Sequence, residues 1–247
     1  MSFIRGYYRL SLSALILSSF AVLIIIGSFL PVTIKKVPLS LRLAQVMVKS
    51  ILWILNVRVI CPEKEKLQGF DGFFFPNHLS YVEVLALYAV MPTRFLAKAE
   101  IREWPAVGII AAAIGCVFVQ RGDKQSRQEA RQALTKVETF PPITIFPEGK
   151  RGPGDALLPF RYGAFEIVTQ GCFAFLPIAA TFSNLEVAIW HRKENLLKAA
   201  WRLASQPEKI VVNLAPLEPH HPTPEDDPVA LAEKVHGELT AVLYPTE

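Results

Sequence analysis

Residues 72–83 read Gly-Phe-Phe-Phe-Pro-Asn-His-Leu-Ser-Tyr-Val-Glu, a stretch that passes from a strand pattern to a helix pattern. Gly72–Phe75 is predicted to be a strand, and Ser80–Val90 is predicted to be a helix. The loop between them carries His78, and Glu83 follows five residues later. A histidine with a carboxylate partner is a candidate general base, because imidazole titrates near neutrality and an acid on its other nitrogen fixes the tautomer.

The spacing of these two residues restricts how they can meet. Positions five apart on one continuous helix diverge by about 140°. We therefore expect His78 in the loop ahead of the helix and Glu83 in the first helical turn. A second interpretation needs no catalysis, because Ser80-x-x-Glu83 is also a capping box, in which the serine caps the helix and the glutamate returns to the N–H of the cap.

Strand-like and helix-like segments alternate along the chain from Val57 onward. This alternation predicts an α/β domain over residues 57–247, with a mixed, largely parallel sheet flanked by helices. In such sheets the functional side chains lie beyond the carboxyl ends of the strands. The further expected strands are Val57–Ile60, Arg94–Ala97, Val117–Gln120, Thr144–Phe146, Phe175–Ala179 and Ile210–Leu214, and the further expected helices are Glu100–Ile114, Lys124–Glu138, Tyr162–Thr169 and Glu225–Leu243.

The first part of the chain is both basic and hydrophobic. Residues 1–62 contain seven Lys and Arg residues and no Asp or Glu, and the whole chain is 51% hydrophobic and only 19% charged. Soluble domains average about 25% charged residues, so this composition is shifted toward lipid and excludes intrinsic disorder. Basic residues interleaved with long aliphatic runs favour anionic lipid headgroups over nucleic acid.

Leu10–Leu30 is a run of twenty-one residues without a charge. A helix of that length rises roughly 30 Å, enough to cross a hydrocarbon core; the alternative is a secretory signal peptide, whose apolar core is usually shorter. Leu39–Leu55 is predicted to be a second, amphipathic helix at the membrane interface. We therefore expect an N-terminal two-helix membrane motif over residues 1–56. Basic residues on both sides of the first helix leave open whether it spans the membrane or folds back.

Several other kinds of site lack their sequence patterns. Cys61, Cys116 and Cys172 form no C-x-x-C pair, and the histidines show no metal-ligand spacing. The sequence has no G-x-S-x-G segment that would carry a nucleophilic serine. We expect neither a metal nor a bound cofactor, and we expect the thiols, which lie in apolar stretches, to be inert.

The segment from Phe73 to Ala180 contains four sequence blocks in a fixed order. The loop with His78 and Glu83 resembles the H-x4-D motif of the glycerolipid acyltransferase superfamily, especially its lysophosphatidate acyltransferases. Any one block is weak, but four in family order are highly specific. The second block comprises Lys98-x-Glu100, Pro105, Gly108 and Gly115–Arg121, and its last part is similar to G-x-x-F-x-x-R. The third block is Phe146–Arg151, similar to F-P-E-G-(Thr/Ser)-R, and it is followed by Phe160–Ala164, similar to F-x-x-G-A. The fourth block is Leu176–Ile178, similar to V-P-I.

The resemblance implies a catalytic role for His78 as general base and for Glu83 as its partner. It also implies a cationic site for the acceptor, since an arginine fork grips a phosphate with two hydrogen bonds and a lysine adds a point charge. Backbone N–H groups near the helix start are expected to stabilise the oxyanion. The residues implied to bind the acceptor and its phosphate are Lys98, Arg121, Glu148, Gly149 and Arg151, and the supporting residues are Asn77, Ser80 and Pro177.

The implied reaction transfers an acyl group from acyl-CoA or acyl-carrier protein to the sn-2 hydroxyl of lysophosphatidate, with the catalytic domain on the cytoplasmic face of the inner membrane. The partners are then the lysophospholipid, the acyl donor and membrane lipids. Two positions depart from the family pattern: Glu83 replaces the usual Asp, and Lys150 replaces the usual Thr or Ser. These departures leave two alternatives open, O-acylation of another lyso-lipid such as a lyso-ornithine lipid, and a catalytically inactive lipid-binding relative.

Overall fold

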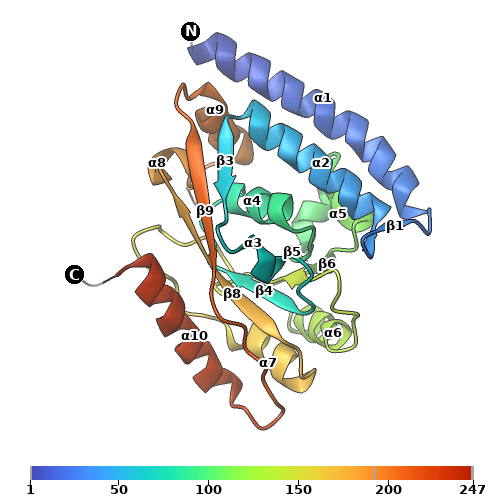
Figure 1. The fold of residues 1–247 in the computed structure, drawn as a ribbon, viewed down its shortest axis with the longest axis vertical. Helices are drawn as coiled ribbons and strands as arrows, with labels where there is room; N and C mark the ends of the chain where they lie inside the picture. The colour runs from blue at the N-terminus through green and yellow to red at the C-terminus, as the bar shows by residue number, and fades with distance from the viewer. Residues whose placement is uncertain (1, 192, 246–247) are drawn as a thin grey trace.

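A computed structural model describes residues 2–191 and 193–245 of the protein. Its main feature within these residues is a seven-stranded sheet with the strand order β3-β9-β8-β4-β7-β5-β6 (Figure 1). Neighbouring strands pair in parallel except β8 and β9, which are antiparallel. The predicted class, a mixed and largely parallel sheet flanked by helices, is confirmed. The strands are β3 (Val57–Ile60), β4 (Phe73–Pro76), β5 (Arg94–Lys98), β6 (Val117–Val119), β7 (Ile143–Thr144), β8 (Phe175–Phe182) and β9 (Ile210–Pro216), and a separate pair is β1 (Thr33–Ile34) with β2 (Val37–Pro38).

Helices cover both faces of the sheet. They are α1 (Ser2–Ser28), α2 (Leu39–Ile54), α3 (Lys64–Leu67), α4 (Val82–Val90), the 3-10 helix η1 (Ala99–Glu103), α5 (Val107–Ala113), α6 (Lys124–Leu134), α7 (Tyr162–Gln170), α8 (Leu185–Ala188), α9 (Leu196–Ser205) and α10 (Pro228–Leu243). One hydrophobic core receives side chains from α2, α4, α5 and α9, and a second core receives side chains from α6, α7 and α10.

The aromatic run in β4 fills the core on both faces of the sheet. Side chains alternate along a strand, so Phe74 points to one face and Phe73 and Phe75 point to the other. All three are fully buried. Phe74 joins the core with α2 and α4, whereas the other two join the core with α7 and α10. A strand that is apolar on both faces belongs in the middle of a parallel sheet, and this places the loop after β4 at the centre of the sheet's carboxyl edge.

One predicted helix is divided in the structure. The segment predicted as Glu100–Ile114 forms η1 and α5, which are separated near Pro105. Proline lacks the N–H that a continuous helix would use, so the break has a local cause. The two short helices approach closely at Gly108, where a Cβ would lie only 2.1 Å from the carbonyl oxygen of Arg102.

Helix α1 lies along α2 on the outside of the molecule and also contacts α9 (Figure 1). Among the described residues it is the one helix long and apolar enough to cross a membrane. Helix α2 differs, because it buries one side in the core that it shares with β4 and α4. The domain boundary after residue 56 and the interfacial position of the second helix therefore stay predictions.

Two arginines of α1 bind the C-terminal end of α9. Nη1 of Arg5 donates to the carbonyl oxygen of Ser205 at 3.2 Å. Nη1 of Arg9 donates to the carbonyl oxygens of Ala204 at 3.2 Å and Gln206 at 2.7 Å. The last carbonyl groups of a helix lack partners within the helix and carry partial negative charge, so the two guanidinium groups stabilise this end and attach α1 to the globular part.

Candidate active site

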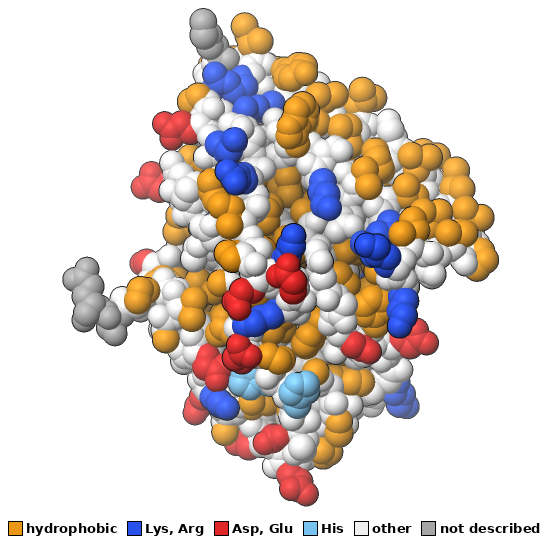
Figure 2. All heavy atoms as spheres, viewed as in Figure 1, with side chains coloured by type: hydrophobic (Ala, Val, Ile, Leu, Met, Phe, Trp, Pro, Cys, Tyr) orange, Lys and Arg blue, Asp and Glu red, His pale blue; other side chains and the backbone are white. Residues whose placement is uncertain are grey.

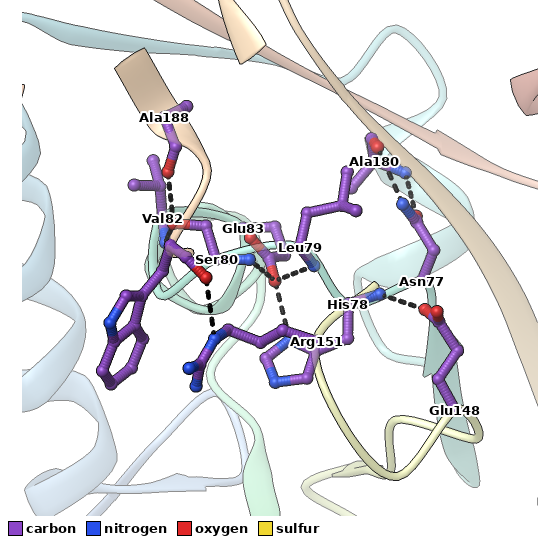
Figure 3. A network of polar contacts seen from close by, with 11 residues as sticks. Asn77, His78, Leu79, Ser80, Val82, Glu83, Glu148, Arg151, Ala180 and Ala188 are labelled. Atoms are coloured by element: carbon purple, nitrogen blue, oxygen red, sulfur yellow. Dashed lines mark hydrogen bonds and ion pairs between the residues drawn. The ribbon is translucent and has the colours of Figure 1, made fainter. Parts of the chain in front are cut away.

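The predicted histidine and acid meet just beyond the end of β4. Nδ1 of His78 lies 2.8 Å from Oε1 of Glu83, with His78 in the loop ahead of α4 and Glu83 in its first turn. The side chain of Glu83 is 2% exposed and that of His78 is 16% exposed, so the ring reaches the surface while the acid does not. In the part of the chain that the structure describes, Nε2 of His78 has no hydrogen-bond partner, and this is the nitrogen that a substrate would meet (Figure 3).

The carboxylate of Glu83 also closes the start of α4. Its Oε1 accepts the N–H of Leu79 at 3.0 Å and the N–H of Ser80 at 2.8 Å. Oγ of Ser80 in turn accepts the N–H of Val82 at 3.3 Å. The return of Glu83 to the helix start is the capping interpretation, and its contact with His78 is the general-base interpretation. One carboxylate oxygen makes both contacts, but the N-cap residue of α4 is Tyr81, which makes no side-chain cap hydrogen bond, so only the glutamate half of the predicted capping box is formed.

The loop of residues 146–152 holds His78 from the opposite side. The ring of Phe146 stacks on the imidazole with 4.1 Å between ring centres. The N–H of Gly152 donates to the carbonyl oxygen of His78 at 2.7 Å, and Oε1 of Glu148 accepts the N–H of His78 at 2.7 Å. Both the backbone and the ring of His78 are therefore fixed by contacts that are remote in the sequence.

Glu148 is a buried carboxyl whose two oxygens are both engaged. It is 1% exposed, and besides its contact with His78 it accepts the N–H of Leu158 through Oε2 at 3.1 Å. Burial raises the pKa of the Glu148 carboxyl to about 7, although the two N–H groups act to lower it. This position favours a role in joining the two loops over the direct acceptor contact predicted from the sequence.

The predicted supporting residues fasten the loop to neighbouring elements. Nδ2 of Asn77 donates to the carbonyl oxygen of Ala180 at 3.1 Å, and Oδ1 of Asn77 accepts the N–H of Ala180 at 2.7 Å (Figure 3). Oγ of Ser80 donates to the carbonyl oxygen of Ala188 at 2.5 Å. Pro177 lies within β8, the neighbour of β4 in the sheet. Asn77 and Ser80 therefore attach the loop to the backbone of β8 and α8.

Two predicted cations lie at the carboxyl ends of adjacent strands. Lys98 ends β5, and its Nζ lies 2.6 Å from Oε1 of Glu100. Arg121 follows β6, and its Nη1 donates to the carbonyl oxygen of Gly149. Gly149 has a φ of +69°, which favours glycine at this position. The contact joins the loop of Arg121 to the loop that carries Arg151.

Arg151 is held by Trp190, which was not among the predicted site residues. Its Nε donates to the carbonyl oxygen of Trp190 at 3.0 Å, and its guanidinium carbon lies 3.8 Å from the centre of the Trp190 ring. The guanidinium of Arg151 and the imidazole of His78 lie on the same side of the start of α4 (Figure 3). Trp190 follows the last sequence block, so no local pattern indicated it.

Three backbone N–H groups at the helix start are already occupied. That of His78 donates to Glu148, and those of Leu79 and Ser80 donate to Glu83. An oxyanion could use them only by displacing a carboxylate that is itself buried. These three groups are therefore engaged in this conformation, and stabilisation of the oxyanion by N–H groups near the helix start stays a prediction.

Two of the three cysteines, Cys61 and Cys116, are unsuited to act as nucleophiles, whereas Cys172 is exposed. Burial raises the pKa of the Cys116 thiol to about 11, and burial likewise raises the pKa of the Cys61 thiol to about 11. Both groups are therefore protonated at neutral pH, and a thiol is a much weaker nucleophile than a thiolate.

The Acyltransferase family model matches residues 58–181, which include the loops of His78 and Arg151. The chain belongs to the acyltransferase family. This acyltransferase is 25% identical over 172 residues to the 1-acyl-sn-glycerol-3-phosphate acyltransferase of Neisseria gonorrhoeae, a match that covers 68% of the chain and 67% of the relative. It is 31% identical over 106 residues to the lyso-ornithine lipid O-acyltransferase of Pseudomonas aeruginosa, which covers 43% of the chain and 41% of the relative.

The acyltransferase also matches a solved structure along nearly its whole length. The crystal structure of the 1-acyl-sn-glycerophosphate acyltransferase PlsC from Thermotoga maritima aligns with a TM-score of 0.70, covering 98% of this chain and 96% of that one. The two sequences are 18% identical, so this match establishes the fold. The predicted family is confirmed, and the protein is an enzyme of the lysophospholipid acyltransferase family.

Proposed function

We propose that this acyltransferase transfers an acyl group from acyl-CoA or acyl-carrier protein to the sn-2 hydroxyl of lysophosphatidate, giving phosphatidate. The observation that carries the proposal is the 2.8 Å contact between Nδ1 of His78 and Oε1 of Glu83. This contact orients an imidazole whose other nitrogen faces the surface, beside a loop that carries an arginine. A proton acceptor and a phosphate-binding cation are then within one site.

In the proposed reaction, Nε2 of His78 takes the proton of the hydroxyl as its oxygen attacks the thioester carbonyl carbon. The tetrahedral intermediate then collapses, the carbon–sulfur bond breaks, and the thiolate receives the proton from His78. Glu83 accepts the hydrogen bond from Nδ1–H and stabilises the imidazolium. A positioned general base of this kind contributes roughly 10²–10⁴-fold in rate.

The acceptor's phosphate is proposed to bind Arg151 and Lys98, with Arg121 in support. Lys98 is 48% exposed and ends a strand at the same edge of the sheet as His78. Arg121 acts through Gly149, whose carbonyl oxygen it holds. An arginine fork with a nearby ammonium is suited to a phosphate monoester.

The hydrophobic N-terminal surface supports a membrane location. Hydrophobic side chains gather over the region of α1 and α2 (Figure 2), and the exposed ones include Ile4, Leu15, Ile26 and Phe29. A lysophospholipid and its acylated product both reside in the bilayer, so a membrane-bound enzyme meets its acceptor without extracting it into water. We propose that the catalytic domain lies on the cytoplasmic face.

A lyso-ornithine lipid is a second candidate acceptor. The Pseudomonas aeruginosa relative is named for this activity, and Lys150 adds a charge where the family has Thr or Ser. The headgroup of such a lipid is an amino acid instead of a phosphate. The two candidates therefore predict different acceptor preferences.

The test is a cell-free assay of the purified full chain in detergent micelles. Acyl-CoA and acyl-carrier protein are each supplied with lysophosphatidate, lysophosphatidylethanolamine or lyso-ornithine lipid, and products are identified by mass spectrometry. We expect acylation of lysophosphatidate by the wild-type protein and none by His78→Ala. Turnover of lyso-ornithine lipid without turnover of lysophosphatidate would overturn the assignment of lysophosphatidate as the acceptor. Equal product from the His78→Ala protein would overturn the catalytic role.

A further inference from the structure

Trp190 lies in the loop between α8 and α9, outside the segment that matches the family model. Its backbone connects the two halves of the site. The N–H of Trp190 donates to the carbonyl oxygen of Leu79 at 3.2 Å, and its carbonyl oxygen accepts Nε of Arg151 at 3.0 Å. One residue thus joins the loop that follows His78 to the arginine proposed to bind the acceptor.

The indole ring of Trp190 is itself fixed on several sides. The ring centre of Tyr81 lies 6.2 Å away in an edge-on arrangement, and the ring centre of Trp104 lies 6.2 Å away at a tilt. Nε1 of Trp190 donates to the carbonyl oxygen of Glu194 at 2.8 Å. The guanidinium of Arg151, 3.8 Å from the ring centre, therefore rests on a platform that has little freedom to move.

Helix α9 holds the loop that carries Trp190. Nε of Arg202 donates to the carbonyl oxygen of Val187 at 3.2 Å, and Nη2 of Arg202 donates to the carbonyl oxygen of Ile189. Nη1 of Arg202 also pairs with the carboxylate of Glu194. The loop is therefore attached at both of its ends to a single guanidinium group.

We propose that Trp190 is a positioning residue that holds Arg151 for the anionic headgroup of the acceptor. This inference rests on the proposed function. A free arginine side chain loses rotamer freedom when it binds a phosphate, and this loss weakens binding. Trp190 restricts the guanidinium before the acceptor arrives and sets its place relative to His78. It acts on acceptor affinity through Arg151 and takes no part in proton transfer.

The first test separates KM from kcat in the wild-type, Trp190→Phe and Trp190→Leu proteins. Ordering one flexible side chain ahead of binding is worth up to about tenfold in affinity, so we expect Trp190→Leu to raise the KM for the lyso-acceptor by up to about tenfold. Trp190→Phe keeps an aromatic face and is expected to raise it less. The KM for the acyl donor and the pH dependence of kcat are expected to stay at the wild-type values. An unchanged acceptor KM in Trp190→Leu would overturn the proposal.

A double-mutant cycle with Arg151→Lys tests whether Trp190 acts through Arg151. Lysine keeps the charge but lacks the planar group that stacks on the indole. We expect the Trp190→Leu change to raise the acceptor KM less than about twofold in the Arg151→Lys background. The full effect in that background would show a general structural role and would overturn the proposal. Thermal unfolding by circular dichroism verifies that each variant is folded. If Trp190→Leu does not fold, Trp190→Phe takes its place in the cycle, and an acceptor KM equal to that of the wild type would overturn the proposal.

A binding measurement makes the inference independent of turnover. Lysophosphatidate in micelles is titrated by calorimetry into the His78→Ala protein and into the His78→Ala, Trp190→Leu protein. We expect binding by the second protein to be weaker by up to about tenfold. If the wild-type protein acylates no acceptor while this difference appears, the proposed function fails and the role of Trp190 stands. Equal affinities would overturn the role of Trp190 whatever the enzyme turns over.

Discussion

Nδ1 of His78 and Oε1 of Glu83 lie 2.8 Å apart, and the same oxygen accepts two backbone N–H groups at the start of α4. The acid is thus positioned by the helix start and in turn positions the imidazole. Because Glu83 is buried and its carboxylate is anchored by the backbone, the ring has one preferred orientation. The orientation of the proposed general base is therefore a consequence of how the helix begins.

The substitution Glu83→Gln is expected to lower kcat at least about 100-fold while the protein remains folded. Glutamine keeps an acceptor oxygen for the N–H groups of Leu79 and Ser80, but it cannot stabilise an imidazolium as a charge does. Initial rates and thermal unfolding, measured on the same preparation, separate the two effects. Glu83→Asp restores the family's usual acid and serves as the matched control, with activity expected between those of Glu83→Gln and wild type. A wild-type rate for a folded Glu83→Gln protein would remove Glu83 from the mechanism.

Glu148 predicts a pH-dependent stability. Burial raises its pKa from an ordinary value of 4.5 to about 7, so the folded protein holds this proton more tightly than the unfolded chain does. The resulting stabilisation is complete below the unfolded pKa and is lost as the pH rises through the folded pKa. Between these two values the free energy of unfolding is expected to fall by up to about 1.4 kcal/mol per pH unit.

The variant Glu148→Gln isolates this contribution, because glutamine does not titrate. Urea unfolding of both proteins at about pH 5 and about pH 8 should show the wild type losing stability relative to Glu148→Gln as the pH rises. Other titrating groups cancel in the difference. A difference that is the same at both pH values would contradict the raised pKa of Glu148.

Arg9 is expected to attach α1 to the globular part of the molecule. The substitution Arg9→Ala removes two hydrogen bonds to the carbonyl oxygens at the end of α9, which we expect to cost about 1–2 kcal/mol. Hydrogen exchange in micelles should then show faster exchange in the N-terminal half of α1 and the end of α9. Arg58→Ala, at an exposed position of β3, is the control and should leave these segments protected. Equal protection in the two variants would mean that Arg9 does not hold α1.

Gly108 and Gly237 make a matched pair for stability. A Cβ at Gly108 would lie 2.1 Å from the carbonyl oxygen of Arg102, so Gly108→Ala must displace backbone and is expected to cost about 2–3 kcal/mol. No atom lies within 4 Å of a Cβ built at Gly237 in α10, and Gly237→Ala is expected to stabilise the protein by about 0.5–1 kcal/mol. Thermal unfolding measures both. A stable Gly108→Ala protein would show that η1 and α5 do not need this close approach.

The strands of the sheet and most of the long helices could be predicted from the sequence, because local sequence patterns specify them. The Phe73–Phe75 run has no polar position, which is typical of a buried central strand, and the spacing of His78 and Glu83 required a loop followed by a helical turn. Helix α9 was not predicted, and the Glu100–Ile114 segment was predicted as one helix instead of two. The division depends on Pro105 and on the close approach at Gly108, and the second of these appears only when the chain is folded.

The amino-acid sequence by itself determined the sheet class and the family blocks, because both are patterns read in order along the chain, and it indicated the pairing of His78 with Glu83, because these residues are only five positions apart. Only the tertiary structure decided that Glu148 accepts a hydrogen bond from the backbone of His78 and that the guanidinium of Arg151 stacks on the ring of Trp190. The physical reason is that strand order brings together residues that are remote in the chain. Burial and stacking, which assign these two residues their roles, arise only after that assembly.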